Sequence, residues 1–184
     1  MINCYKIIGK FYDPDSLSYR IVTEHGKQVA KMALEVAAIV PDLKPDVNFI
    51  REAGLLHDIG IFLTDAPLIG CLGKYQYICH GYKGREILDD LGLPVHALVC
   101  ENHVGVGITA KEIKSCQLPL PERDMVPVSI EEQIICYADK FFSKGLKQQS
   151  KKKTINEVLH TLKHYGDDKV EIFLKWSKIF GNIG

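Results

Sequence analysis

The sequence predicts an all-α protein, a helical bundle of about seven or more helices. Apolar residues recur three and four positions apart along most of the chain, which is the spacing of residues on one face of a helix. Alternating apolar and polar stretches joined by hairpin turns, the pattern of antiparallel strands, are absent. A length of 184 residues fits one domain with one hydrophobic core, so we expect residues 1–184 to fold as a unit.

Seven helices are expected in chain order. The first begins after the capping sequence Asp13-Pro14-Asp15-Ser16 and ends near Val40-Pro41, because a residue before proline disfavours the helical conformation. The others are expected at about 46–57, 81–91, 94–103, 129–143, 154–165 and 167–180. The stretch 105–128 contains three prolines and two glycines, which predicts a long irregular connection or a short helix between loops.

Composition and charge exclude several classes of protein. Lys and Arg number 23, and so do Asp and Glu, so the chain lacks the positive field that nonspecific binding to nucleic acid polymers or anionic membranes needs. No apolar run approaches the length of a membrane span or follows a basic leader, so we expect a cytoplasmic protein. The 6 cysteines form no C-x-x-C pair, which favours buried thiols in a reducing compartment over disulfides.

Four histidines and two aspartates stand on the expected inward faces of separate helices. They are His25, His57, Asp58, His80, His103 and Asp139. His25, for example, lies three positions after Val22 and four before Val29, on the apolar stripe of its helix. A lone histidine in such a place is most often a hydrogen-bonded core residue, and an unpaired buried carboxylate is costly. Six such groups can be neutralised together by two divalent cations.

An extended motif connects these residues. It consists of Ala53-Gly54-Leu55-Leu56-His57-Asp58-Ile59-Gly60, with His25 before it and Tyr137-Ala138-Asp139-Lys140 after it. On these residues the chain resembles the HD-domain (HDIG-type) metal-dependent phosphohydrolases, from about His25 to Lys144. The resemblance implies a single HD domain with its signature region at about 20–145 and C-terminal helices at about 154–180. It also implies that His25, His57, Asp58 and Asp139 surround one metal ion.

His80 and His103 look like the additional histidines of binuclear HD enzymes, which include the HD-GYP cyclic-dinucleotide phosphodiesterases and the HD-type diadenosine tetraphosphate hydrolases. By this resemblance they hold a second ion, and Asp58 bridges the two. In the mononuclear members of the family, the equivalent side chains would face the substrate phosphate instead. Ile61 stands where HD-GYP enzymes carry a lysine, which counts against cyclic diguanylate as the substrate.

The resemblance and the ligand types predict a metal-dependent phosphohydrolase. A divalent metal lowers the pKa of coordinated water toward about 7, which suits hydrolysis of a phosphoester or phosphoanhydride bond in a small, nucleotide-like substrate. The expected catalytic residues are Asp58, His80 and His103. Imidazole and carboxylate ligands suit iron, manganese, zinc, cobalt or nickel, and binuclear relatives favour iron or manganese. The candidate phosphate-binding residues, which are the nearest cations by sequence, are Lys83, Lys140 and Arg123.

Two other functions are compatible with the sequence alone. A regulatory or ligand-binding HD module would keep the metal ligands without turnover, and an assay with p-nitrophenyl phosphate would distinguish it from an enzyme. A structural all-α interaction protein would need six inward polar residues without metal, and elemental analysis would distinguish that. The sequence indicates neither the leaving group nor the oligomeric state.

Overall fold

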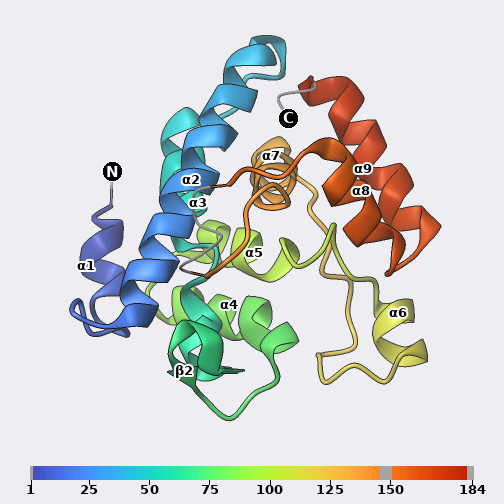
Figure 1. The fold of residues 1–184 in the computed structure, drawn as a ribbon. Coiled ribbons are helices and arrows are strands. Elements are labelled where there is room, and N and C mark those ends of the chain that lie inside the picture. The colour runs from blue at the N-terminus through green and yellow to red at the C-terminus, as the bar shows by residue number, and fades with distance from the viewer. Residues whose placement is uncertain (1, 146–150, 182–184) are drawn as a thin grey trace.

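The computed structural model describes residues 2–145 and 151–181 (Figure 1). The described residues form nine α-helices: α1 (Cys4–Ile8), α2 (Leu17–Ile39), α3 (Val47–Leu56), α4 (His80–Asp90), α5 (Pro94–Asn102), α6 (Ala110–Ser115), α7 (Ile130–Asp139), α8 (Ile155–Lys163) and α9 (Asp167–Phe180). Short 3-10 helices occur at η1 (Pro41–Leu43), η2 (Ile59–Leu63), η3 (Pro67–Ile69) and η4 (Tyr77–Cys79). The prediction of an all-α fold is confirmed.

Capping residues explain why most expected helix boundaries agree with the observed ones. The Ser16 hydroxyl accepts a hydrogen bond from the N–H of Tyr19 (3.1 Å) at the start of α2, and the Asp46 carboxylate caps α3 in the same way. The expected end of the fifth helix near residue 143 is wrong, because α7 ends at Asp139. There the backbone tightens into bonds between residues three apart, as from the Phe142 N–H to the Asp139 carbonyl (3.1 Å).

Other segments depart from the sequence expectations. Helix α1 was not expected. Strands β1 (Asp65–Ala66) and β2 (Cys71–Leu72) pair antiparallel, although no hairpin was predicted, because strands of 2 residues are too short to show an alternating pattern. The stretch 105–128 contains α6, which begins with a capping box between Thr109 and Glu112, so the short-helix alternative applies there.

The cysteines are unpaired, as their spacing predicts. All six are free thiols, and Cys116 is the exposed one among them. In the part of the chain that the structure describes, no helix combines the length and the apolar character needed to cross a membrane.

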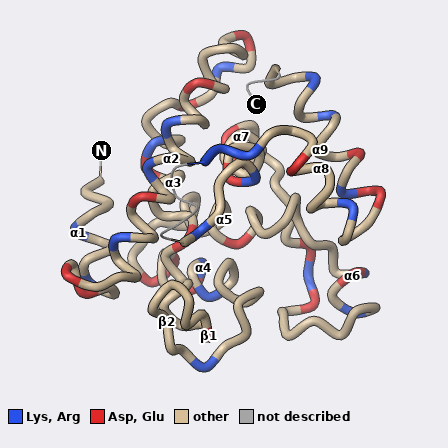
Figure 2. Tube along the Cα trace, viewed as in Figure 1, with Lys and Arg blue, Asp and Glu red and all other residues tan. Residues whose placement is uncertain are grey.

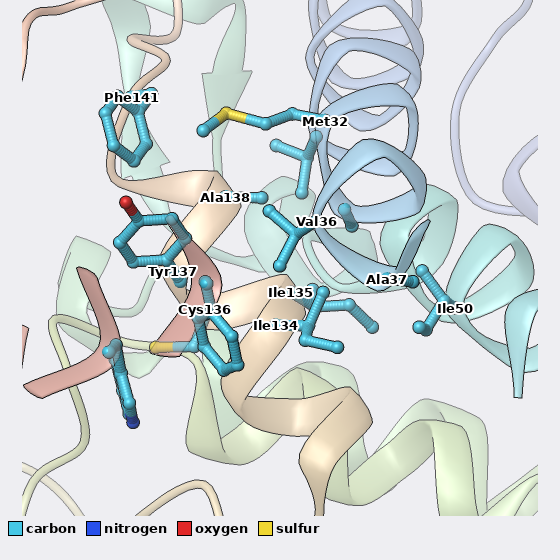
Figure 3. Packing of buried hydrophobic residues seen from close by; sticks show 14 of the residues in the cluster. Met32, Val36, Ala37, Ile50, Ile134, Ile135, Cys136, Tyr137, Ala138 and Phe141 are labelled. Atoms are coloured by element: carbon cyan, nitrogen blue, oxygen red, sulfur yellow. The ribbon is translucent and has the colours of Figure 1, made fainter. Parts of the chain in front are cut away.

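Helix α7 occupies the centre of the bundle, between α2 and α3 on one side and α8 and α9 on the other (Figure 1). Figure 3 shows aliphatic side chains of α2 and α3, such as Val36 and Ile50, facing the α7 residues Ile134 and Ile135. On the other side of α7, the ring of Tyr137 stacks on Phe173 of α9, with centroids 4.9 Å apart. This packing leaves Asp139, at the end of α7, held firmly from several directions.

Glycines set the packing of α4 against α5 and η2. A Cβ atom at Gly84 would lie 2.2 Å from the Sγ atom of Cys100, and one at Gly60 would lie 2.2 Å from the carbonyl oxygen of His80. These separations are far below van der Waals contact, so only glycine permits the helices to approach this closely. The close approach brings the start of α4, with His80, beside the end of α5, with His103.

Candidate metal centre

The structure brings all six candidate ligands together. His25 lies within α2, His57 and Asp58 follow α3, His80 begins α4, His103 follows α5 and Asp139 ends α7. Each of the six is buried, with exposed fractions between 0% for His25 and 6% for Asp139. The inward orientation predicted from helical spacing is therefore confirmed for every one of them.

Backbone carbonyl groups orient three of the histidines. In each, the Nδ1–H donates a hydrogen bond to the carbonyl of the residue three positions earlier. The pairs are His57 with Gly54 (2.8 Å), His80 with Tyr77 (2.7 Å) and His103 with Cys100 (2.7 Å). Because a carbonyl oxygen can only accept, Nδ1 carries the proton and the lone pair of Nε2 points at the centre of the cluster. This is the arrangement that prepares an imidazole to bind a metal.

Asp58 faces the other ligands with both of its carboxylate oxygens. Its Oδ2 atom lies 3.3 Å from Nε2 of His25 and 3.2 Å from Nε2 of His57. Its Oδ1 atom lies 3.4 Å from Nε2 of His80 and 3.4 Å from Nε2 of His103. The two oxygens thus divide the histidines into two pairs.

Asp139 adds a second carboxylate to the first pair. Its Oδ1 atom lies 2.8 Å from Nε2 of His25 and 3.5 Å from Nε2 of His57. We call His25, His57 and Asp139 the first half of the centre, and His80 and His103 the second half. In each of three sets of residues, the ligand atoms lie within 4.8 Å of one another. The sets are His25, His57 and Asp58; His57, His103 and Asp139; and Asp58, His80 and His103.

The ligand set fits a divalent cation because several of its hydrogen-bond acceptors face one another. Nε2 of His80 lies 3.1 Å from Nε2 of His103, although the Nδ1 atoms of both rings already carry the proton. Among the described residues, Nε2 of His57 and Oδ1 of Asp58 are buried without a hydrogen-bond partner. Buried acceptors at this density are costly unless a cation neutralises them, and nitrogen and carboxylate oxygen are common ligands of transition metals. The cluster is therefore able to bind divalent metal.

The carboxylates remain ionised in this buried position. Burial raises the pKa of Asp58, but His57 and the Lys144 ammonium outweigh burial and hold that pKa well below its usual range. Burial likewise raises the pKa of Asp139, and Lys140 and Lys144 together hold it well below its usual range. The centre therefore keeps two negative charges.

The histidines respond unequally to the same surroundings. Burial lowers the pKa of His25 to about 4 and that of His80 to about 3, so both imidazoles are neutral. Burial also acts to lower the pKa of His57, but Asp58 and Asp139 outweigh it and raise this pKa to about 9. A proton on His57 would occupy the lone pair that a metal needs, so a metal ion and this proton compete for the same place.

Two lysines lie beside the carboxylates. Nζ of Lys140 is 2.7 Å from Oδ2 of Asp139 and donates to the carbonyl of His103 (3.1 Å). Nζ of Lys144 is 2.9 Å from Oδ2 of Asp58. Lys140 is one of the phosphate-binding candidates predicted from the sequence, whereas Lys144 is not. No helical periodicity connects Lys144 with Asp139, because the chain leaves α7 at that residue.

The other two candidate phosphate-binding residues lie elsewhere. Lys83 pairs with Oε2 of Glu86 (2.8 Å). Arg123 donates from Nε to Oε1 of the buried Glu101 (3.2 Å). Each of these cations pairs with an acidic side chain, and neither is among the residues that line the cavity over the centre.

A cavity of about 560 Å³ opens over the second half of the centre. Its lining includes the candidate ligands His80, His103 and Asp139, and it also includes Lys140 and Lys144. The rest of the lining is largely apolar and comes from η4, from the loop after α5, from the stretch after α7 and from α6, α8 and α9. A volume of this size suits a small molecule.

Comparison with known proteins gives the family. The family model described as "HD domain" matches residues 22–143. The chain belongs to the HD-domain family. The match covers all six candidate ligands, so the resemblance drawn from the motif is confirmed.

Relatives of this HD-domain chain include archaeal proteins. It is 38% identical over 121 residues to an uncharacterized protein of Methanocaldococcus jannaschii, covering 64% of each chain. It is 28% identical over 182 residues to the tRNA (cytidine(56)-2'-O)-methyltransferase of Thermoplasma volcanium, covering 98% of this chain and 46% of the relative. The chain thus spans less than two thirds of the length of these curated relatives.

Among solved structures, the chain is similar to the HD domain of the phosphodiesterase PgpH of L. monocytogenes. The TM-score is 0.53 at 14% sequence identity, covering 96% of this chain and 95% of that one. The same domain in complex with cyclic-di-AMP matches with a TM-score of 0.53 at 13% identity, over 96% and 94% of the two chains. The likeness confirms the HD-type fold.

Proposed function

We propose that the protein is a metal-dependent phosphohydrolase that cleaves a phosphoester or phosphoanhydride bond in a small, nucleotide-like substrate. The observation that carries the proposal is the position of Asp58, whose two oxygens face two separate pairs of histidines below a cavity. Membership of the HD-domain family supports the same class of reaction. The catalytic residues in this proposal are Asp58, His80 and His103.

The ligand arrangement supports two divalent ions. His25, His57 and Asp139 would hold one, His80 and His103 the other, and Asp58 would contact both. When bound, such ions act as Lewis acids toward phosphoryl oxygens and lower the pKa of coordinated water toward about 7. The ligand types accept iron, manganese, zinc, cobalt or nickel, and the resemblance to binuclear members favours iron or manganese.

The residues of the chain have their own parts in this reaction. The carbonyl groups that accept from Nδ1 keep the imidazoles of His57, His80 and His103 oriented as ligands. Lys140, held by the His103 carbonyl and Asp139, offers a cation to a phosphoryl oxygen in the cavity, and Lys144 does so beside Asp58. The apolar lining excludes water from the uncharged part of the substrate.

Charge and cavity size favour a small phosphorylated substrate over a nucleic acid polymer. Equal numbers of acidic and basic residues give the chain no field that would attract a polyanion, and the cavity of about 560 Å³ fits a nucleotide-sized molecule. The PgpH domain, which binds cyclic-di-AMP, shares the fold and supports this class of ligand. Free thiols fit a reducing, cytoplasmic setting.

The test begins with metal content and turnover. We would load the full chain anaerobically with Fe²⁺ or Mn²⁺, count the bound metal by elemental analysis, and assay p-nitrophenyl phosphate, its bis ester, nucleotides, dinucleoside polyphosphates, sugar phosphates and short RNA. We expect turnover of small phosphorylated compounds that is lost after chelation and restored by metal. Metal binding without turnover of any compound would support the regulatory module, and absence of bound metal would support the structural protein. Cleavage of RNA alone would overturn the proposed substrate class.

A further inference from the structure

The segment after α7 supplies one wall of the cavity. Residues 153–169, in α8, α9 and the turns around them, lie outside the 22–143 region that the family model matches. Lys153, Val158, Leu162 and Tyr165 of this segment line the same cavity as His80. Specificity of this chain within its family can therefore reside in this wall.

Lys153 is fixed near the metal centre by its backbone. Its N–H donates to the carbonyl of Phe141 (2.8 Å), two positions beyond the ligand Asp139. Immediately after it, Thr154 and Glu157 form the capping box that starts α8. Figure 2 shows the basic stretch 151–153 crossing in front of the end of α7. The side chain of Lys153 is half-buried and faces the cavity from this fixed point.

Charge pairing distinguishes Lys153 from the other lysines of the cavity. The paired lysines are Lys140 with Asp139 (2.7 Å), Lys144 with Asp58 (2.9 Å) and Lys169 with Glu112 (2.5 Å). Lys153 makes no ion pair with any residue of the segments 2–145 and 151–181. Burying an ammonium without a carboxylate partner is costly, and an anion that binds from outside the protein would reduce this cost.

Burial and neighbouring charges both act on Lys153. Burial lowers its pKa most, Asp139 raises it, and Lys140 and Lys144 lower it, so that the pKa lies below its usual range. A bound anion would relieve both the burial cost and the repulsion between the lysines. The position therefore favours a ligand group with negative charge in addition to the group at the metal centre.

This wall is tied to the loop and the helix on the other side of the cavity. Nζ of Lys169, which is buried, donates to the carbonyl of Gly107 (3.0 Å) in the loop that follows His103. Its contact with Glu112 ties α9 to the start of α6. On the same wall as Lys153, Val158 and Leu162 contribute apolar lining. The cavity thus combines a charged end at the metal centre with an apolar side.

We propose that Lys153 binds a second phosphoryl group, adjacent to the one that lies at the metal centre, and that the preferred ligands are phosphoanhydrides of nucleoside 5′-diphosphate type. The apolar face of α8 then accommodates the uncharged part of the ligand. The inference rests on the proposed function for the position of the first phosphoryl group. It adds a selectivity for two neighbouring phosphoryl groups over one.

The test compares binding of one and two phosphoryl groups. We would titrate AMP and the non-hydrolysable α,β-methylene analogue of ADP into the full chain at saturating Mn²⁺ by calorimetry. The variants are Lys153→Ala, Lys153→Arg and, as a matched control from the same basic run, Lys151→Ala, whose exposed ammonium lies 3.7 Å from Glu157. Mn²⁺ also binds the two nucleotides in solution. This contribution is the same for the parent and the three variants, so it cancels when the proteins are compared.

We expect the parent to prefer the diphosphate analogue by about tenfold. Lys153→Ala should lose most of this preference and keep its AMP affinity within about twofold, whereas Lys153→Arg and Lys151→Ala should retain the preference. Equal affinity of the parent for both ligands, an unchanged preference in Lys153→Ala, or an equal loss of both affinities would overturn the inference. A Lys153-dependent preference in a protein that hydrolyses nothing would sustain the inference and refute the hydrolase.

Discussion

The two halves of the metal centre are held by different kinds of packing. His25, His57 and Asp139 belong to or follow α2, α3 and α7, whose aliphatic and aromatic side chains fill the larger of two hydrophobic clusters, where the sequence predicted one core (Figure 3). His80 and His103 lie where α4 meets α5 through glycine contacts. The cavity reaches both histidines of the second half and neither histidine of the first.

The comparison shows that one site can depend both on contacts between side chains and on glycines that leave room for close backbone packing. The first half is supported by many side-chain contacts, and each can be weakened at moderate cost. Its glycine contacts are looser than those of the second half, since a Cβ at Gly26 or Gly54 would lie 3.0 Å from the nearest atom of the facing helix. The second half depends on space that a single methyl group would fill, so one added carbon has a large effect. Asp58 contacts both halves and should be the most sensitive position of all.

Asp58→Asn should have the largest effect, since it removes the charge that both halves share. We expect kcat/KM to fall by about 10²–10³-fold or more, together with a loss of bound metal. The fold should survive because asparagine has nearly the same volume as aspartate. Circular dichroism, metal analysis and turnover of the best substrate measure these three outcomes. Asp90→Asn, at an exposed position in α4, is the matched control, and a parent-like Asp58→Asn would show the site assignment to be wrong.

Gly60→Ala tests whether the packing around the second half requires a residue without a side chain at position 60. The added Cβ would lie 2.2 Å from the His80 carbonyl oxygen and 2.4 Å from the Gly84 nitrogen, both of which are backbone atoms that cannot turn aside. We expect the free energy of unfolding in urea to fall by about 3 kcal/mol. The control is Gly9→Ala, where φ is −65° and the nearest atom lies 3.2 Å from the new Cβ. Similar stabilities of the two variants would argue against the glycine contact.

Removing the second half should leave the first intact. The double variant His80→Ala/His103→Ala alters none of the residues that make the contacts of His25 and His57 with Asp58 and Asp139. We expect bound metal to drop from two ions to one per chain, measured by elemental analysis after anaerobic loading with iron or manganese. A parent chain that saturates at one ion would refute the binuclear arrangement.

The sequence predicts the first half more completely than the surroundings of the cavity. His25 and Asp139 lie on apolar stripes of amphipathic helices, and helical spacing alone places them inward. The motif at His57 and Asp58 then identifies the family. These residues are predictable because regular helices convert spacing in sequence into direction in space.

The lysines around the cavity were harder to predict, because they do not follow regular helical spacing. Lys144 and Lys153 lie on either side of the stretch 146–150, beyond the end of α7, where spacing carries no direction. Lys83 and Arg123 looked suitable by proximity in sequence, but they pair with Glu86 and Glu101 and do not line the cavity. Ion pairing between distant segments depends on the folded chain, which sequence spacing does not show.

A conservative core change sharpens the comparison from the side of the first half. Ile134, on α7, is fully buried in the larger core, so Ile134→Val removes one methylene from a site that neighbouring side chains can partly refill. We expect a loss of about 1 kcal/mol in unfolding free energy, with metal content and activity unchanged, because no ligand depends on that one contact. Ile179→Val, the same change on a face of α9 that is 50% exposed, should cost less than about 0.5 kcal/mol. Loss of metal in Ile134→Val, or a loss of unfolding free energy as large as in Gly60→Ala, would show the two halves to be equally sensitive. The contrast between side-chain packing and close glycine contacts would then be wrong.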